Sequence, residues 1–202
     1  MKEQRLRREP QGVIRSFVAM AIESSVQKEI GDFQARLRQK VQGTGCRVSW
    51  VKPETIHLTV KFLGDIQIGQ VEPILDALRR AAEGVGAFGL KIEGIGVFPS
   101  QRNPRVVWVG ISEGVEKLRI IQPRVEEELA ALGFAREKKE FNPHLTLGRI
   151  RFSEAAAALG KILADLPYPV FGQVMIQDLR LMKSDLRPEG AIHTELGRIP
   201  LS

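Results

Sequence analysis

The chain has 202 residues, and 43% of them are hydrophobic, which is enough for a packed core and excludes a wholly disordered protein. Lys and Arg outnumber Asp and Glu by 30 to 24, and the resulting charge of +6 favours a polyanionic partner or substrate, nucleic acid above all. No apolar run approaches the length of a membrane span, so we expect no membrane association. Cys46 is the single cysteine, which excludes an internal disulfide and predicts a reducing, cytoplasmic location.

The first half of the chain alternates between strand and helix patterns. Residues 1–12 are charged and aperiodic, and we expect a flexible basic arm there. Beyond the arm, apolar spacing and turn residues define each element. We expect a buried strand over 14–22, a helix over 23–41, a short strand over 46–51, a strand over 56–63 ended by Gly64 and Asp65, a helix over 69–83, and strands over 88–98 and 105–111 joined by a polar loop.

The second half repeats this pattern. We expect a helix over 114–132, a strand over 144–150, an Ala-rich helix over 153–166 capped by Ser153 with Glu154 in its first turn, and strands over 170–182 and 191–201 around a turn at 184–190. Each half has one helix before its central strand and another after it. The sequence therefore predicts an α+β duplication: one bilobal domain over 13–202, in which two pseudo-symmetric antiparallel sheets face a central cleft with helices outside.

The sequence His-Leu-Thr followed by an aliphatic residue occurs twice, beginning at His57 and at His144. Alternation of polar and apolar residues is typical of a strand with one wet face and one buried face. Residues i and i+2 of a strand project from the same side, so His57 is expected beside Thr59, and His144 beside Thr146. If the two strands face one another, the space between them holds two titratable bases and two hydroxyl donors. The other interpretation is that these residues merely line a wet sheet face.

Several segments around these two motifs resemble the two-histidine (2H) phosphoesterases. The closest similarity is to the LigT-like branch of RNA 2′,3′-cyclic phosphodiesterases, historically called 2′-5′ RNA ligases. The segments that carry the resemblance are WVKPE (50–54), KFLG (61–64), GVFP (96–99), RVVW (105–108) and NPHLTLGR (142–149).

The resemblance implies a bilobal fold with both histidines in a central groove and neither metal nor other cofactor. It also implies that His57 donates a proton and that His144 accepts one. We therefore expect an enzyme that opens RNA 2′,3′-cyclic phosphate ends, tRNA fragments among them, to 2′-phosphomonoesters, with 2′-5′ ligation as the reverse reaction. We expect it to be a monomer.

The same chemistry can be argued from the residues. Opening a cyclic phosphodiester needs a base for water, an acid for the departing alkoxide and donors for the phosphoryl oxygens. Two imidazoles suit the first two roles near neutral pH. Thr59, Thr146 and Arg149 are candidates for the third, because hydroxyls donate hydrogen bonds and a guanidinium matches phosphate oxygens. Strict alternation would send Arg149 to the opposite face from Thr146, so its role requires the strand to bulge at Gly148. Otherwise Arg149 is a solvated surface residue.

Other residues leave alternatives open. Phe62 occupies the place after His57 that Arg149 occupies after His144, and core packing is favoured there over a stacking platform for the terminal base. His193 is expected on the exposed face of the last strand, without a role, and residues 126–128 on a solvated helix face. No Cys pair or His-x-x-x-His helix supports zinc. The alternative functions are an RNA-end binding protein without turnover and a phosphodiesterase for a small cyclic nucleotide derivative.

Overall fold

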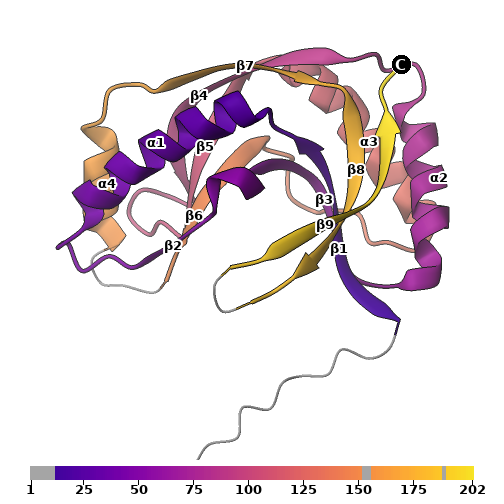
Figure 1. Cartoon of the computed structure of the whole chain (residues 1–202), viewed down its shortest axis with the longest axis horizontal. Helices are drawn as coiled ribbons and strands as arrows, with labels where there is room; N and C mark the ends of the chain where they lie inside the picture. Colours follow the sequence, from indigo (N-terminus) through magenta and orange to yellow (C-terminus); the bar gives the residue numbers. More distant parts are fainter. Residues whose placement is uncertain (1–11, 152–155, 188–189) are drawn as a thin grey trace, which may run out of the picture.

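One antiparallel sheet runs through the part of the chain that the structure, a computed structural model, describes: residues 12–151, 156–187 and 190–202. Nine strands form it in the order β7-β4-β5-β6-β3-β1-β8-β9, with β2 paired to β6 (Figure 1). The strands are β1 (Val13–Ala21), β2 (Val48–Trp50), β3 (His57–Gln67), β4 (Phe88–Phe98), β5 (Val106–Glu113), β6 (His144–Ile150), β7 (Val170–Ile176), β8 (Asp178–Asp185) and β9 (Ile192–Pro200).

Helices cover the outside of the sheet in two pairs, α1 with α4 and α2 with α3 (Figure 1). They are α1 (Ser24–Val41), α2 (Val71–Ala82), α3 (Val115–Ala131) and α4 (Ala156–Ala164), and short 3₁₀ turns at Pro53–Thr55 and Ile68–Gln70 precede β3 and α2. Each long helix turns an apolar stripe to the sheet, as its 3.6-residue spacing predicts. Among the helices so described, none is long and apolar enough to cross a membrane.

The two halves of the sheet meet at the two motif strands. β3 and β6 are antiparallel neighbours joined by a single register pair, Leu58 opposite Leu145. Both leucines are fully buried and belong to one continuous core. The α+β class and the antiparallel strands with helices outside are confirmed. The two expected sheets are instead two halves of one curled sheet, and the motif strands β3 and β6 pair where these halves join.

Three expected elements differ from the structure. The predicted strand over 170–182 is two strands that break at Gln177, because β7 pairs with β4 in one half and β8 pairs with β1 in the other. β3 does not end at Gly64 but continues to Gln67, since the positive φ of Gly64 (74°) accommodates a bulge at Leu63. The helix expected over 153–166 is observed from Ala156 to Ala164. Its proposed cap at positions 153 and 154 lies outside the described residues, as do residues 1–11 of the expected arm.

Candidate active site

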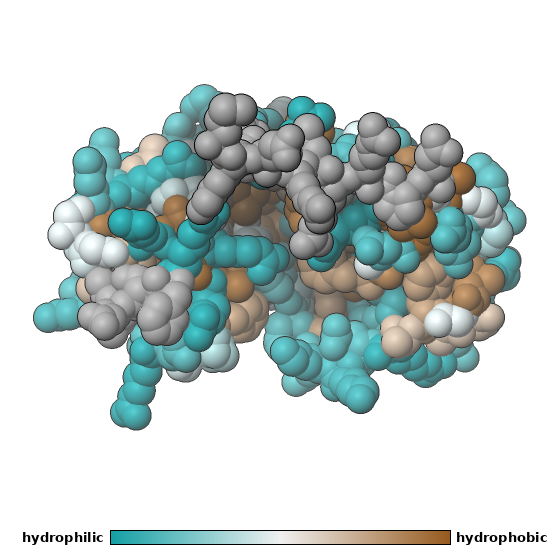
Figure 2. Space-filling model, turned by 90° about the horizontal axis from the view of Figure 1, so that it is seen from below, coloured by the Kyte–Doolittle hydropathy of each residue, from teal (hydrophilic) through white to brown (hydrophobic). Residues whose placement is uncertain are grey.

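The structure brings the two motifs together on adjacent strands. The antiparallel register set by Leu58 and Leu145 brings His57 across from Thr146, and Thr59 across from His144. The leucines point into the core, whereas the four polar side chains are partly exposed on the other face. Figure 2 looks at the molecule from below Figure 1 and shows a hollow between the two halves, with hydrophobic surface inside and hydrophilic surface around it.

Both imidazoles are fixed by the same local hydrogen bond. His57 Nδ1 lies 2.8 Å from the carbonyl oxygen of Thr55, and His144 Nδ1 lies 2.7 Å from that of Asn142. A carbonyl only accepts, so Nδ1 carries the proton in each ring and Nε2 of the neutral ring is free. A proline lies shortly before each motif strand, and the bond at Nδ1 leaves Nε2 of each ring directed away from that carbonyl.

The environment keeps both histidines neutral in the free protein. Burial and, to a lesser extent, the nearby His193 together lower the pKa of His57 to about 4, against the opposing effect of its hydrogen bond to the backbone of Thr55. Burial also lowers the pKa of His144, and the positive charge of Arg149 adds to this effect. Arg149 therefore lies close enough to His144 to act on its titration.

A bulge in β6 carries Arg149 to the face of His144. Leu147 has no residue opposite it on β5, because Thr146 and Gly148 face consecutive residues of that strand. After the bulge the alternation is displaced by one residue, so Leu147 and Gly148 are both buried and Arg149 is exposed. The expected bulge at this point of the strand is confirmed.

A matching bulge in β3 exposes Phe62. Val60 has no residue opposite it on β1, because Thr59 and Lys61 face consecutive residues there. Phe62 consequently lies on the face of His57 with 64% of its surface exposed. The favoured interpretation of Phe62 as a core residue is wrong, because the bulge reverses the alternation on which it depended.

The bulge in β6 is held from α1 by a buried glutamine that the sequence analysis missed. Gln34 Nε2 donates to the carbonyl oxygens of Leu147, at 3.0 Å, and Val51, at 2.8 Å. The carbonyl of Leu147 also accepts the Val51 N–H at 2.8 Å. Gln34 is 2% exposed, and its bond to the Leu147 carbonyl satisfies a buried backbone group. A polar residue on the apolar stripe of a predicted helix was the only available signal.

A buried ion pair ties β3 to α3. Lys61 Nζ lies 2.6 Å from Glu126 Oε2 and 2.8 Å from the carbonyl oxygen of Ala135. The same carboxylate accepts the N–H of Glu137, in the segment that leads to β6. Glu126 is 8% exposed, so the expectation of a solvated face at 126–128 is wrong for this residue. The pair connects the first motif strand to the chain entering the second.

His193 lies beside the first histidine, although no role was expected for it. Its ring contacts the rings of His57 and Phe17, which come from β3 and β1. His144 instead packs edge-on against Phe98. The two catalytic candidates therefore have different aromatic neighbours. Of those beside His57, His193 can itself titrate.

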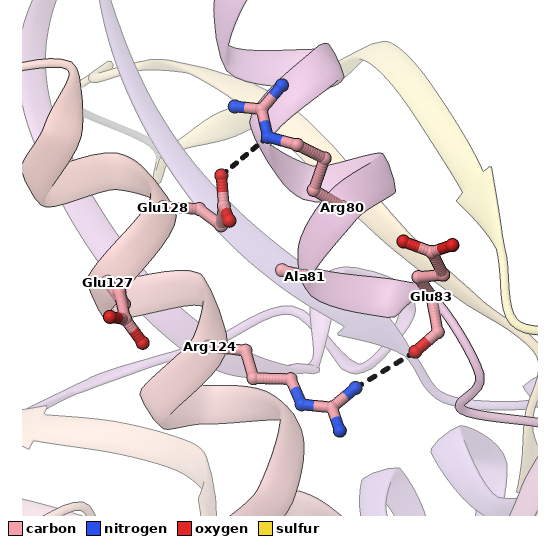
Figure 3. Close-up of a pocket in the computed structure, with 6 residues that line it drawn as sticks. All are labelled: Arg80, Ala81, Glu83, Arg124, Glu127 and Glu128. Carbon is pink, nitrogen blue, oxygen red and sulfur yellow. Dashed lines mark hydrogen bonds and ion pairs between the residues drawn. The ribbon is translucent and has the colours of Figure 1, made fainter.

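A cavity of about 270 Å³ between α2 and α3 does not contain the site (Figure 3). Arg80 Nε pairs with Glu128 at 2.6 Å across it, and Arg124 donates to the carbonyl oxygen of Glu83 at 2.9 Å. No predicted site residue lines this cavity. Among the residues that the structure describes, no three His, Cys, Asp or Glu side chains form a metal-sized group.

Comparison with known proteins agrees with this geometry. The family model described as LigT like Phosphoesterase matches residues 21–108 and 109–193. The RNA 2′,3′-cyclic phosphodiesterase of Aeropyrum pernix is 37% identical over 164 residues, 80% of this chain and 91% of the relative. The protein of the same name from Methanothermobacter thermautotrophicus is 30% identical over 183 residues, 91% of this chain and 96% of the relative.

Solved structures share the fold. The crystal structure of TT0787 of Thermus thermophilus superposes with a TM-score of 0.73 at 26% identity, covering 93% of this chain and 98% of that one. The structure of E. coli LigT complexed with 3′-AMP gives a TM-score of 0.75 at 22% identity, with 94% and 99% covered. The family model covers most of the chain, and its two histidine motifs lie on the neighbouring strands β3 and β6. The chain belongs to the LigT-like phosphoesterase family.

Proposed function

We propose that the protein hydrolyses the 2′,3′-cyclic phosphodiester at the end of an RNA to a 2′-phosphomonoester. The observation that carries this proposal is the pair of imidazoles on adjacent strands, each with Nδ1 bonded to backbone and Nε2 free. A binding protein would have no need of two such proton carriers. Relatives named RNA 2′,3′-cyclic phosphodiesterase over most of this chain support the same substrate class.

The two histidines divide the proton transfers between them. His144 Nε2 takes a proton from water while the water oxygen forms a bond to phosphorus. The bond from phosphorus to the ribose 3′ oxygen breaks, and protonated His57 gives its proton to that oxygen. The product carries a 2′-phosphate and a 3′-hydroxyl. Exchange with solvent then returns His144 to its neutral form, and His57 takes up a proton again when the next phosphodiester binds.

The surrounding charges support this assignment. Arg149 disfavours a positive charge on His144 and so preserves the neutral ring that a base requires. His57, with its pKa near 4, is neutral in the free protein at pH 7. The negative charge of a bound phosphodiester raises the pKa of His57 and favours the imidazolium that an acid requires. The negative charge of the bound phosphodiester thus promotes protonation of His57.

The remaining groups bind the phosphate and the terminal nucleoside. In the described part of the chain, the hydroxyls of Thr59 and Thr146 bond to no protein group, which leaves them free to donate to phosphoryl oxygens. Arg149 lies on the same face and adds a charged donor. Phe62 presents an exposed ring beside the same site, and stacking of the terminal base on it explains why so large an apolar side chain faces solvent.

The deciding experiment is incubation with an RNA bearing a 2′,3′-cyclic phosphate, in the presence of EDTA. We expect a single 2′-phosphomonoester product, identified by chromatography against 2′- and 3′-phosphate standards. Binding without turnover would favour the RNA-binding alternative. Turnover restricted to small cyclic nucleotides would favour the other phosphodiesterase. A 3′-phosphate product would contradict the proposed leaving group.

Three finer proposals accompany the main one. When the 5′-hydroxyl of another RNA takes the place of water, it attacks the 2′,3′-cyclic phosphate, the 3′ oxygen departs with a proton, and a 2′-5′ linkage forms; by microscopic reversibility the same site can cleave that linkage. The lone Cys46 suits a reducing compartment, so we place the activity in the cytoplasm, where tRNA fragments supply cyclic ends. The protein acts as a single-domain monomer.

A further inference from the structure

Arg151 extends the basic face of β6 beyond the candidate active site. Its Nε lies 2.8 Å from the hydroxyl oxygen of Ser49 on β2. Ser49 is paired directly opposite Arg149, so these two side chains lie on the same side of the sheet. The bond to Ser49 therefore places the guanidinium of Arg151 on the face that carries Arg149 and His144. The N–H of Arg151 also bonds to the carbonyl of Arg47 at 2.9 Å, which continues the strand pairing past Ile150.

The charges on this face are oriented but not neutralised. No carboxylate in the described part of the chain pairs with Arg149 or Arg151, whereas Arg180 and Arg198 in the other half both pair with Asp178. Among the described residues Arg151 is bonded through Nε only, which leaves both terminal nitrogens for another acceptor. A fixed guanidinium loses less conformational freedom on binding an anion than a mobile one does.

The spacing of the two arginines matches a nucleic-acid backbone. Residues 149 and 151 are separated along the strand direction by about 6.6 Å, comparable with the separation of successive phosphates in an extended RNA strand. A 2′,3′-cyclic phosphate ends its strand, so every other phosphate of the substrate lies on its 5′ side. The face of β6 offers one cation at the reacting phosphate and a second one nucleotide away.

We propose that Arg151, held by Ser49, binds the phosphodiester on the 5′ side of the terminal nucleoside. This inference rests on the proposed function and adds to it a preference for RNA oligomers over cyclic mononucleotides. The ligand is a non-bridging oxygen pair of an internal phosphodiester, bound by the terminal nitrogens of Arg151. Arg149 serves the terminal phosphate, whatever the length of the RNA.

The test compares a cyclic mononucleotide with a dinucleotide ending in a 2′,3′-cyclic phosphate, which contains one internal phosphodiester. The measured quantity is the ratio of kcat/KM for the dinucleotide to that for the mononucleotide, which removes any general loss of activity. Arg151→Gln should lower this ratio by about 10-fold, since a charge-assisted contact is lost. Ser49→Ala should lower it by a smaller factor. Arg119→Gln removes the same charge from the exposed surface of α3 and should leave the ratio unchanged.

A neutral methylphosphonate in place of the internal phosphodiester completes a double-mutant cycle. Its effect on the wild-type ratio should be large, and its effect on the Arg151→Gln ratio small. Equal effects in both proteins would overturn the inference, as would a ratio for Arg151→Gln equal to that for Arg119→Gln.

Equilibrium binding of the dinucleotide 2′-phosphate gives a second readout that needs no turnover. Arg151→Gln should weaken this binding by about 10-fold relative to Arg119→Gln. Failure to hydrolyse any cyclic substrate would contradict the proposed function. In that event unchanged product binding by Arg151→Gln would overturn the subsite as well, and weakened binding would support it.

Discussion

The imidazole ring of His193 lies edge-on against that of His57, with ring centroids 5.2 Å apart and ring planes at 88°. Phe17 completes a triangle, with its centroid 4.8 Å from that of His57 and 5.0 Å from that of His193. Burial lowers the pKa of His193, and its Nδ1 is buried without a hydrogen-bond partner among the described residues. Two imidazoles in contact resist simultaneous protonation, so they titrate as a pair.

The pH dependence of kcat/KM should reflect these lowered pKa values. With the pKa of His57 near 4 and that of His144 below 6.5, we expect a bell-shaped profile of kcat/KM with its maximum between about pH 4 and 6.5. His193→Gln removes a positive neighbour, so the pKa of His57 should rise and the acid limb should move to higher pH. NMR titration of the imidazole protons checks the pKa directly. A kcat/KM maximum above pH 7, or an acid limb unmoved in the variant, would contradict this account.

Substitution of either histidine proposed to be catalytic should abolish most of the turnover. General acid or base catalysis contributes about 10²–10⁴-fold per group, so His57→Ala and His144→Ala should each lose a factor of this size in kcat. Since both groups act in one step, the double variant should be scarcely slower than either single variant. Thermal unfolding of each variant controls for loss of fold. Multiplication of the two losses in the double variant would show that the residues act independently.

A substrate with an activated 3′ leaving group should separate the acid from the base. Such a leaving group needs little protonation, so His57→Ala should recover much of its lost rate on this substrate. His144→Ala should recover little, because water still lacks a base. The comparison needs only the kcat/KM of each variant on both substrates. Recovery by the His144 variant instead would mean that the two roles are reversed.

Phe62→Ala should weaken substrate binding without weakening the fold. Stacking on an aromatic ring contributes about 1–3 kcal/mol per base, so KM for a cyclic nucleotide should rise by roughly 10-fold or more. A ribose 2′,3′-cyclic phosphate without a base should show no such rise. Because Phe62 is 64% exposed, the free energy of unfolding should change by no more than about 0.5 kcal/mol. A large destabilisation with unchanged KM would restore the packing interpretation.

Gln34→Leu should disturb the bulge of β6. The carbonyls of Leu147, which is buried, and Val51, which is partly buried, each lose a donor, which should destabilise the protein by about 1–3 kcal/mol in chemical denaturation. Activity should fall in addition, because the bulge sets the position of Arg149. Gln39→Leu makes the same change at an exposed position of α1 and serves as the matched control. Equal behaviour of the two variants would show that the bulge holds without Gln34.

Local sequence patterns were sufficient to predict some strand bounds and the class of the fold. The bounds expected for β4 (Phe88–Phe98) and β6 (His144–Ile150) are confirmed. The class of the fold and the meeting of the two motifs at one site followed from the repeat, whereas the pairing of the two motif strands within one sheet did not. The bulge in β6 was predicted from a conflict between the alternation and the chemistry expected of Arg149.

Long-range relationships were not accessible from those patterns. The break at Gln177 depends on the chain crossing between halves of the sheet, which no local signal records. Phe62 was misassigned because the bulge at Val60 leaves no mark in the sequence comparable to Gly148. His193 reaches His57 only because the sheet curls across β1 and β8. Glu126 on α3 is buried where Lys61 of β3, far away in the sequence, pairs with it.

The single pair of Leu58 and Leu145 has a further geometric consequence. Opposed residues of antiparallel strands are related by a local two-fold axis perpendicular to the sheet, and here that axis also exchanges the two motifs. A phosphorus atom bound on the axis would have one imidazole on each side of it. In-line displacement needs the entering and departing oxygens at opposite apices of the phosphorus. The symmetry between the two motifs therefore places one imidazole near the entering oxygen and the other near the departing oxygen. The reverse reaction needs the same two groups with their acid and base roles exchanged.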